Sequence, residues 1–342
     1  SSSGAWAYLG MVHPDLNSGP ESLPHSPSVD VSKAKGKILV IRGGAIGDFI
    51  LTVPVFQQLR KYFPSTHLEI LGYPRVAKLA VDAGWADACK SIEEPELVRF
   101  FAPSGVAPAQ WLSYFSQFDI IISYLFDPDG FFRNNIQQSG KHHYIQGPHR
   151  PDDRGRLHAT DALLQPLEKL AVYETGLIPD LTRLGRHAGK TESGKLHVAL
   201  HPGSGSPSKN WPLGHWLKWV EQMVMDCDCH FILVAGEADR EAAQSLTSAI
   251  PAARRTLMLN CPLEKVAQQL AGCDLFVGHD TGISHLAAAM AIPSLVIWGP
   301  TNLEVWQPRG RHVTIIESDE GLAGITPDQI NREARRLIEM QP

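Results

Sequence analysis

The chain has 342 residues, 43% of them hydrophobic, which is sufficient for two domains of about 150 residues with separate cores. A formal net charge of −5 without any basic block argues against nucleic-acid binding. No apolar run approaches the roughly 18 residues that span a bilayer, and the N-terminus lacks a signal-peptide pattern. Together with five cysteines in no framework spacing, these properties predict a soluble or peripheral cytoplasmic protein with reduced thiols.

The first half of the chain shows the pattern of an α/β domain. The nearly continuous apolar run 37–41 predicts a strand that is buried on both faces of a parallel sheet. An apolar stripe over 49–63 predicts a helix, which either begins near Thr52 or is kinked at Pro54. Strands are also expected at 67–71 and 119–123, and the segment 127–156, rich in Gly, Pro, His and Arg, is expected to be loop-rich.

A second α/β pattern follows the polar, glycine-containing stretch 184–195, which we interpret as an interdomain linker. Strands are predicted at 196–201, 230–235, 274–278 and 294–298, and helices at 212–225, 239–250, 263–271 and 283–291. Such alternation predicts an open parallel sheet. A last helix begins with Thr326 as N-cap, Pro327 in its first position and Gln329 in its third.

These boundaries divide the chain into four parts. Residues 1–36, rich in Ser, Pro and Gly without a period, are expected to form a disordered extension. An N-terminal domain is expected at 37–185, a C-terminal domain at 195–325, and a C-terminal helix at 326–342.

The turns at the carboxyl ends of the strands carry the functional signals, because ligands of open α/β sheets bind there. In the first turn, Arg42 to Asp48, glycines allow a close backbone approach. Arg42 stands where the dinucleotide fingerprint requires its first glycine, which disfavours NAD and an NAD-dependent epimerase. Asp48, at the head of the next helix, is either an N-cap or a general base.

The second turn, His201 to Pro212, is a Gly/Ser loop between a strand and a helix. Its amides and hydroxyls could line a diphosphate that Lys209 neutralises, and a surface loop without a ligand is the alternative.

The third turn, Gly236 to Glu241, contains three acids that could bind ribose hydroxyls or complement a helix dipole. Those acids are Glu237, Asp239 and Glu241.

The fourth turn, within Gly278 to Ala287, joins a strand to an apolar helix through Asp280, Thr281 and Gly282. Unpaired amides and the helix dipole favour phosphate at such a terminus, whereas a simple turn with a helix cap is the alternative. His285, one turn inside the helix, either donates to a phosphate or packs against the neighbouring strand.

In this order and spacing, the turns resemble glycosyltransferase family 9, the ADP-heptose:lipopolysaccharide heptosyltransferases and their relatives, over roughly residues 37–340. The resemblance rests on Gly44 to Asp48 with Thr52-Val53-Pro54 behind it, on His201 to Pro212 and on Gly278 to Ala287. It implies an α/β GT-B architecture, in which two Rossmann-like domains with parallel sheets face each other across a cleft. It also implies a C-terminal helix that crosses back to the first domain.

The resemblance implies roles for individual residues as well. Asp48 would deprotonate the acceptor hydroxyl, and Lys209 would act with it in catalysis by holding the leaving diphosphate. The first domain would bind the acceptor, with Gly44, Arg75 and Arg133 as candidates. The donor nucleotide would be bound by Gly203, Ser204, Gly205, Lys209, Glu237, Asp280, Thr281, Gly282 and His285.

The activity implied by the resemblance is inverting transfer of a sugar, heptose from ADP-heptose, to a lipopolysaccharide-type or other cell-envelope glycan. Lys209 and a helix N-terminus would replace a metal, so we expect metal-independent chemistry without a cofactor. The expected partners are the nucleotide-sugar and a lipid-linked or oligosaccharide acceptor, with peripheral contact at the inner face of the cytoplasmic membrane. A GT-B enzyme with another nucleotide-sugar donor and a non-catalytic nucleotide-sugar-binding protein remain the alternatives.

Overall fold

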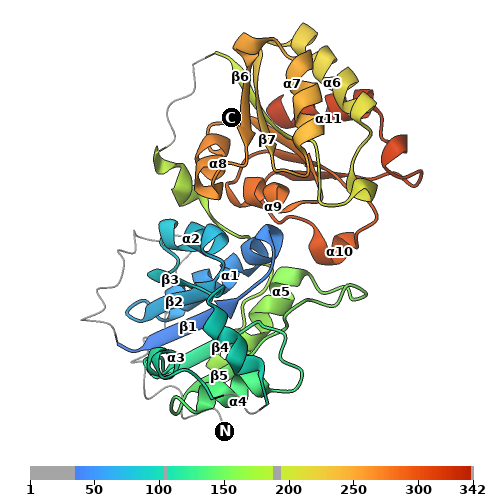
Figure 1. Cartoon of the computed structure of the whole chain (residues 1–342). Coiled ribbons are helices and arrows are strands. Elements are labelled where there is room, and N and C mark those ends of the chain that lie inside the picture. Colours follow the sequence, from blue (N-terminus) through green and yellow to red (C-terminus); the bar gives the residue numbers. More distant parts are fainter. Residues whose placement is uncertain (1–34, 104–105, 188–193, 340–342) are drawn as a thin grey trace, which may run out of the picture. The chain divides into compact units, whose positions relative to one another are not determined.

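The computed structural model describes residues 35–103, 106–187 and 194–339 (Figure 1). The predicted extension 1–36 therefore lies outside the described residues, except for its last two. The chain forms two compact units. The first contains most residues up to Leu177, and the second contains Ile178 onward together with Ile46–Ile50 and Asp153–His158. This division falls eight residues before the predicted end of the first domain at 185.

The first unit is built on a five-stranded parallel sheet with the order β3-β2-β1-β4-β5. Its centre is β1, which is buried on both faces, as its apolar sequence predicts. The strands are β1 (Lys37–Arg42), β2 (His67–Gly72), β3 (Ala88–Ser91), β4 (Ile120–Ser123) and β5 (His143–Gln146). The helices are α1 (Ile46–Tyr62), α2 (Pro74–Asp82), α3 (Ala109–Phe115), α4 (Phe131–Gln137) and α5 (Ala159–Leu164).

Helix α1 begins at Ile46, six residues before the predicted start at Thr52, and it runs through Pro54. The early start follows from Gly44, whose φ of 103° lies in the left-handed region and turns the chain directly from β1 into the helix. Of the two alternatives, a start near Thr52 is therefore wrong, and a kink at Pro54 stays a prediction.

The segment 127–156 is more regular than predicted, because it contains α4 and β5. The carboxylate of Asp127 accepts hydrogen bonds from the backbone amides of Phe132 (3.1 Å) and Arg133 (3.0 Å) and so caps α4. Only Ile145 is fully buried in β5, an edge strand. A short edge strand and a seven-residue helix have too little periodicity to be recognised from sequence.

The second unit is built on a six-stranded parallel sheet with the order β11-β10-β9-β6-β7-β8. Its strands are β6 (Leu196–His201), β7 (Cys229–Ala235), β8 (Arg255–Leu259), β9 (Leu275–His279), β10 (Ser294–Ile297) and β11 (Val313–Ile316). Its helices are α6 (Leu213–Asp226), α7 (Arg240–Ala249), α8 (Leu263–Leu270), α9 (Gly282–Ala289), α10 (Leu303–Trp306) and α11 (Pro327–Glu339). The four predicted strands and the predicted helices are confirmed to within two residues. The sequence missed the partly exposed edge strands β8 and β11.

The C-terminal helix α11 groups with the second unit, and the expectation that it crosses back to the first stays a prediction. It packs against α6, and its apolar stripe joins the core of the second unit through Ile330, Ala334 and Leu337. Its predicted start is confirmed, since the amide of Gln329 donates to Thr326 Oγ1 at 3.2 Å.

The predicted linker 184–195 is only partly described, since 188–193 lie outside the described residues. Its first residues end a 3₁₀ helix, Thr182–His187, that contacts α8. A Cβ at Gly185 would lie 2.6 Å from the Cβ of Ala271, so the two backbones pack closely there. Leu184 to His187 are therefore part of the second unit and not linker.

The segment Asp153–His158 is hydrogen-bonded to α10 and the residues next to it in the second unit. Asn302 Nδ2 donates to the carbonyls of Asp153 (2.8 Å) and Gly155 (3.0 Å), and Trp306 Nε1 donates to Asp153 Oδ1 (2.7 Å). His158 Nε2 lies 2.9 Å from the carbonyl of Gln307. These bonds explain why a segment from the first half of the sequence groups with the second unit.

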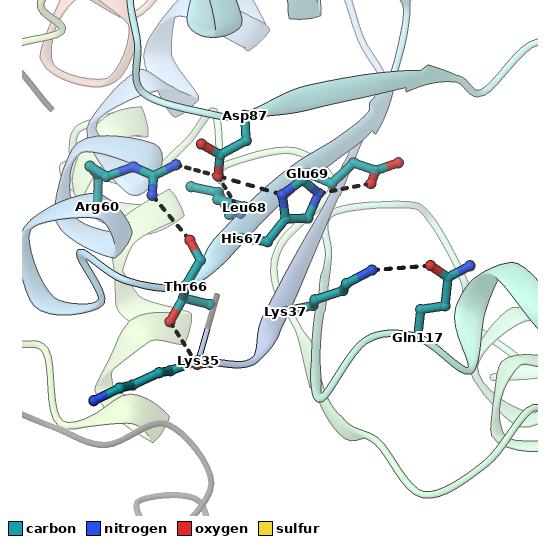
Figure 2. A network of polar contacts seen from close by, with 9 residues as sticks. All are labelled: Lys35, Lys37, Arg60, Thr66, His67, Leu68, Glu69, Asp87 and Gln117. Atoms are coloured by element: carbon teal, nitrogen blue, oxygen red, sulfur yellow. Dashed lines mark hydrogen bonds and ion pairs between the residues drawn. The ribbon is translucent and has the colours of Figure 1, made fainter. Parts of the chain in front are cut away.

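A buried ionic network joins the last turn of α1 to the amino-terminal end of β2 and to Asp87, directly before β3 (Figure 2). Arg60 donates to Asp87 Oδ2 at 2.6 Å, and both side chains are only 4% exposed. The same carboxylate oxygen accepts the amide of Leu68 at 2.8 Å. The ring of His67 lies 3.8 Å from Asp87 Oδ2 and 3.3 Å from Glu69 Oε2. This edge of the sheet is therefore fixed by charge as well as by apolar packing.

Replacing Arg60 with Met should cost about 3–5 kcal/mol of unfolding free energy in urea titrations, because the Asp87 charge would stay buried after losing its ion pair with Arg60. The control is Lys61→Met. Lys61 pairs with Glu174 at the surface, at 3.1 Å with side chains 40% and 36% exposed, and its loss should cost below about 1 kcal/mol. Equal losses in the two variants would contradict a structural role for the network.

Candidate active site

The centre of the second sheet is a topological switch point. The strands β6 and β9 are neighbours in the sheet. After β6 the chain continues to β7 on one side, and after β9 it continues to β10 on the opposite side. β6 and β9 end in register, with His201 paired to Gly278. The loops that follow them diverge at the carboxyl edge, which is where open α/β sheets bind ligands.

Two predicted site residues meet at this point. Lys209, at the end of the 3₁₀ turn Pro207–Lys209, donates to Asp280 Oδ2 at 2.6 Å. The lysine side chain is 31% exposed and that of Asp280 is 9% exposed. The lysine stays accessible to a ligand, and the carboxylate beneath it holds the ammonium at the edge of the sheet.

The loop that carries Lys209 is closed by its own hydrogen bonds. The hydroxyl of Ser204 lies 2.7 Å from both the carbonyl of Ser206 and Oδ1 of Asn210, and the amide of Lys209 donates to Ser206 at 3.0 Å. Ser204 is buried, so its hydroxyl serves the loop itself. Gly205 is exposed, and a Cβ there would meet only open space.

Gly203 has a packing reason to be glycine. A Cβ at this position would lie 2.1 Å from Oδ1 of Asp239. Asp239 is only 8% exposed, its Oδ2 accepts the amide of Gly236 at 3.3 Å, and its Oδ1 is buried without a hydrogen-bond partner among the described residues. The missing side chain thus allows the loop to lie directly on this carboxylate.

The N-terminus of α9 forms the other side of the switch point. Thr281 occupies the N-cap position, but its side chain accepts no capping hydrogen bond, and Oγ1 is buried without a partner in the described part of the chain. Thr281 thus stands at the cap position without a side-chain capping bond, and its role in binding an anion stays a prediction. A Cβ on Gly282 would lie 2.6 Å from Cβ of Ile46, so this glycine permits a close approach of Ile46–Ile50. The first amides of α9 keep the partial positive charge that favours an anion.

His285 lies against Ile46–Ile50. A Cβ on Gly47 would lie 3.3 Å from His285 Cδ2. Burial lowers the pKa of His285 to about 4, against the opposing effect of the Asp280 and Asp48 carboxylates. Asp48 is half-buried in the first turn of α1, inside the helix and not at its N-cap position. Asp48, His285 and Asp280 are thereby brought together in one unit.

The three acids of the turn after β7 have different surroundings. Glu237 is 73% exposed and is bound by Arg240, at 2.7 and 3.1 Å, and by Asn260, at 3.0 Å. Asp239 is buried as described above, and Glu241 is exposed in the first turn of α7. Glu237 is thus the most accessible of the candidates at the strand end.

The acceptor candidates lie in the first unit, without a shared contact among them. Gly44 is exposed, and its positive φ accounts for its identity. Arg75 is exposed over the ring of Tyr73, at 5.5 Å, and Arg133 is exposed over Tyr144, at 5.6 Å.

Sequence reasoning assigned no role to His279, at the end of β9. It is completely buried, and its ring contacts both ends of the loop that carries Lys209. A histidine at the end of an apolar strand was the only available signal.

Within the described ranges, no group of three or more His, Cys, Asp or Glu side chains could hold a metal ion. No helix in the described part of the chain is long and apolar enough to cross a membrane.

Acid should destabilise the protein through its buried histidines. Burial lowers the pKa of His279 to about 3 and that of His285 to about 4, whereas the unfolded value is about 6.5. Between pH 6.5 and 4 the unfolded chain binds more protons, so stability falls as the pH drops through that window. Urea titrations should give about 2 kcal/mol less stability per histidine at pH 5 than at pH 7.5. His279→Gln should flatten this dependence, whereas His312→Gln, at an exposed position, should leave it unchanged. A flat wild-type profile would disprove the assignment.

Comparisons with known proteins agree with this architecture. Residues 170–327 match the model of glycosyltransferase family 9 (heptosyltransferase). A putative glycosyltransferase of Haemophilus influenzae is 24% identical over 335 residues, 89% of this chain and 92% of that protein. Lipopolysaccharide heptosyltransferase 1 of Pseudomonas aeruginosa is 33% identical over 122 residues, 36% of this chain and 34% of that protein.

Two solved structures show the same fold. The E. coli ADP-heptose lipopolysaccharide heptosyltransferase II has a TM-score of 0.72 at 17% identity, covering 89% of this chain and 98% of that chain. The E. coli heptosyltransferase WaaC with ADP has a TM-score of 0.69 at 16% identity, covering 88% and 99%. Residues 170–327 of this chain are thus similar to glycosyltransferase family 9, and its two units on parallel sheets have the GT-B fold of the solved heptosyltransferases.

Proposed function

We propose that this glycosyltransferase moves heptose from ADP-heptose to a cell-envelope glycan of the lipopolysaccharide type, with inversion and without a metal. The observation that carries the proposal is the Lys209–Asp280 pair at the switch point beside the N-terminus of α9. A cation and a helix N-terminus at one strand edge are suited to a diphosphate. The choice of donor is supported by a relative, since E. coli WaaC has been solved with ADP and with ADP-2-deoxy-2-fluoro heptose.

The proposed reaction is a single displacement. The Asp48 carboxylate takes the proton of the acceptor hydroxyl, and the acceptor oxygen forms a bond to the anomeric carbon of the sugar. The bond from this carbon to the diphosphate oxygen breaks, and its electron pair leaves with ADP. Lys209 and the first amides of α9 stabilise the charge on the leaving diphosphate, while general-base help lowers the barrier to attack.

Asp280 would act through Lys209 in this scheme. A second carboxylate directly against a diphosphate is repulsive, whereas one that holds the lysine ammonium is not. The exposed Glu237 is suited to the ribose hydroxyls, and Thr281 Oγ1 and the amides of Gly282 are suited to the phosphate. The acceptor would bind the first unit, where exposed Arg75 and Arg133 can pair with acidic groups.

A nucleotide panel and a product analysis test the donor and the stereochemistry. ADP should raise the melting temperature with the logarithm of its concentration above Kd, and UDP and GDP at the same concentrations should give smaller shifts. Transfer from ADP-heptose should continue in excess EDTA and give a product of inverted anomeric configuration by proton NMR. Preference for UDP would identify another donor class, and ADP binding without transfer to any saccharide would favour a non-catalytic binding protein.

A lipid-linked acceptor would bring the protein to the membrane surface. We therefore expect flotation at low salt with liposomes that contain the lipid-linked acceptor, because binding of the acceptor would hold the protein at their surface. Failure to float at low salt would argue for a free oligosaccharide as acceptor.

A further inference from the structure

His279 connects the two ends of the loop that carries Lys209. Its Nε2 lies 2.8 Å from the backbone nitrogen of Trp211, after Lys209, and its Nδ1 lies 3.4 Å from the carbonyl oxygen of Gly203, before it. Both contacts are buried, and the histidine side chain is not exposed to solvent. One side chain on β9 therefore spans the base of a loop that begins after β6.

The partners of the ring determine its tautomer. A backbone N–H can only donate, so Nε2 of His279 must accept from Trp211 and cannot carry a proton. In a neutral ring the proton is then on Nδ1, where it is directed at the carbonyl of Gly203. The ring also lies edge-on to Trp216, with centroids 5.5 Å apart. A protonated ring would place two N–H groups against each other, and burial favours the neutral form as well.

The far end of the loop has a second anchor in Trp211 itself. Its indole Nε1 donates to the carbonyl of Ile325 at 2.8 Å, and the side chain is 2% exposed. Trp211 thus cannot move without breaking two buried hydrogen bonds. Lys209 stands only two residues before this fixed point, so the position of its ammonium next to Asp280 depends on where His279 holds the loop.

We infer that His279 is a positioning residue, which holds the Gly203–Trp211 loop closed so that Lys209 meets Asp280 and the donor diphosphate. The inference rests on the proposed function for its effect on the donor. However, the closure of the loop is a property of the protein alone, and it can be measured without any nucleotide. His279 acts through Lys209 and touches neither the sugar nor the phosphates.

Three substitutions separate the two hydrogen bonds of His279. His279→Gln can still accept from Trp211, because its amide reaches the position of Nε2. His279→Asn can still donate to Gly203, because its amide lies near the position of Nδ1. His279→Leu can do neither. The control is His197→Gln, since His197 is also a buried histidine of the central strands but lies at the opposite end of the sheet.

The first measurement is the labelling of Lys209 by an acylating reagent in the protein without nucleotide, followed by mass spectrometry. His279→Leu should raise the labelling rate of Lys209 by roughly fivefold or more, because the loop opens locally. The labelling rates of His279→Gln and His279→Asn should lie between those of His279→Leu and the wild type. The exposed Lys218 should react equally in all variants. An unchanged rate at Lys209 in all three His279 variants would overturn the inference, and the Gln and Asn variants decide it if the Leu variant does not fold.

The second measurement is donor kinetics. Misplacing Lys209 should raise KM for ADP-heptose and lower kcat/KM by roughly 10- to 100-fold in His279→Leu, with the glutamine variant largely restored. Nitrogen-15 NMR of the wild type should show a protonated Nδ1 and an unprotonated Nε2 at His279. Protonated Nε2 would overturn the inference. If the wild type binds no ADP, the proposed function is refuted. The labelling of Lys209 would then still decide whether His279 holds the loop closed.

Discussion

Replacing Asp48 with Asn should abolish sugar transfer while ADP still binds. The amide cannot take a proton from the acceptor hydroxyl, so we expect kcat to fall by about 10²- to 10⁴-fold, the range for loss of a general base. The dissociation constant of ADP, measured by calorimetry, should change by less than about threefold, because that variant keeps Lys209 and the N-terminus of α9 intact.

The control for this variant must remove the other effect of Asp48, which is to complement the dipole of α1 from its first turn. Asp328 has the corresponding place in the first turn of α11, so Asp328→Asn loses a similar dipole interaction away from the site. It should keep wild-type turnover. Full activity in Asp48→Asn would refute the assignment of the base.

A double-mutant cycle on Lys209 and Asp280 should show strong coupling in catalysis. Lys209→Met removes the charge that we propose stabilises the departing diphosphate, and it should lower kcat by about 10²- to 10³-fold. Asp280→Asn leaves the lysine in place but releases it from its 2.6 Å partner, so its effect should be smaller. Because the carboxylate acts through the lysine, adding Asp280→Asn to Lys209→Met should cost little more than Lys209→Met alone.

Lys218→Met serves as the control for this cycle, since Lys218 is exposed on α6. It should leave kcat and KM unchanged. Additive effects of Lys209→Met and Asp280→Asn would show that the two residues act on the substrate separately. That result would indicate that Asp280 binds the donor directly.

The sequence predicted most of the second unit because strong local patterns determine it. Buried strands such as β6 and β9 are continuous apolar runs, and the start of α11 is set by Thr326 and Pro327. The meeting of Lys209 with Asp280 could be anticipated only as a shared strand edge, since 71 residues separate them. The order of strands in the sheet, which no local pattern encodes, puts the two loops side by side.

The errors have physical causes of the same kind. The start of α1 was missed because an early helix depends on the φ of Gly44. That Gly203 and Gly282 bind the donor stays a prediction, but nothing in the sequence indicated that each also makes room for one neighbour, Asp239 or Ile46. For His279 the only signal was a histidine at the end of an apolar strand, because its role depends on two backbone groups, at Gly203 and Trp211, that are distant in the sequence.

The interleaving of the two units limits how this enzyme can be cut and recombined. A fragment that begins at Ile178 lacks Asp153–His158, so the side chains of Asn302 and Trp306 lose the acceptors that hold them. It also lacks Ile46, which fills the space above Gly282. Chimaeras that exchange donor specificity should therefore transplant these short segments together with the C-terminal half. During synthesis, the second unit cannot be completed from its own continuous stretch of chain, and its final assembly draws on residues made much earlier.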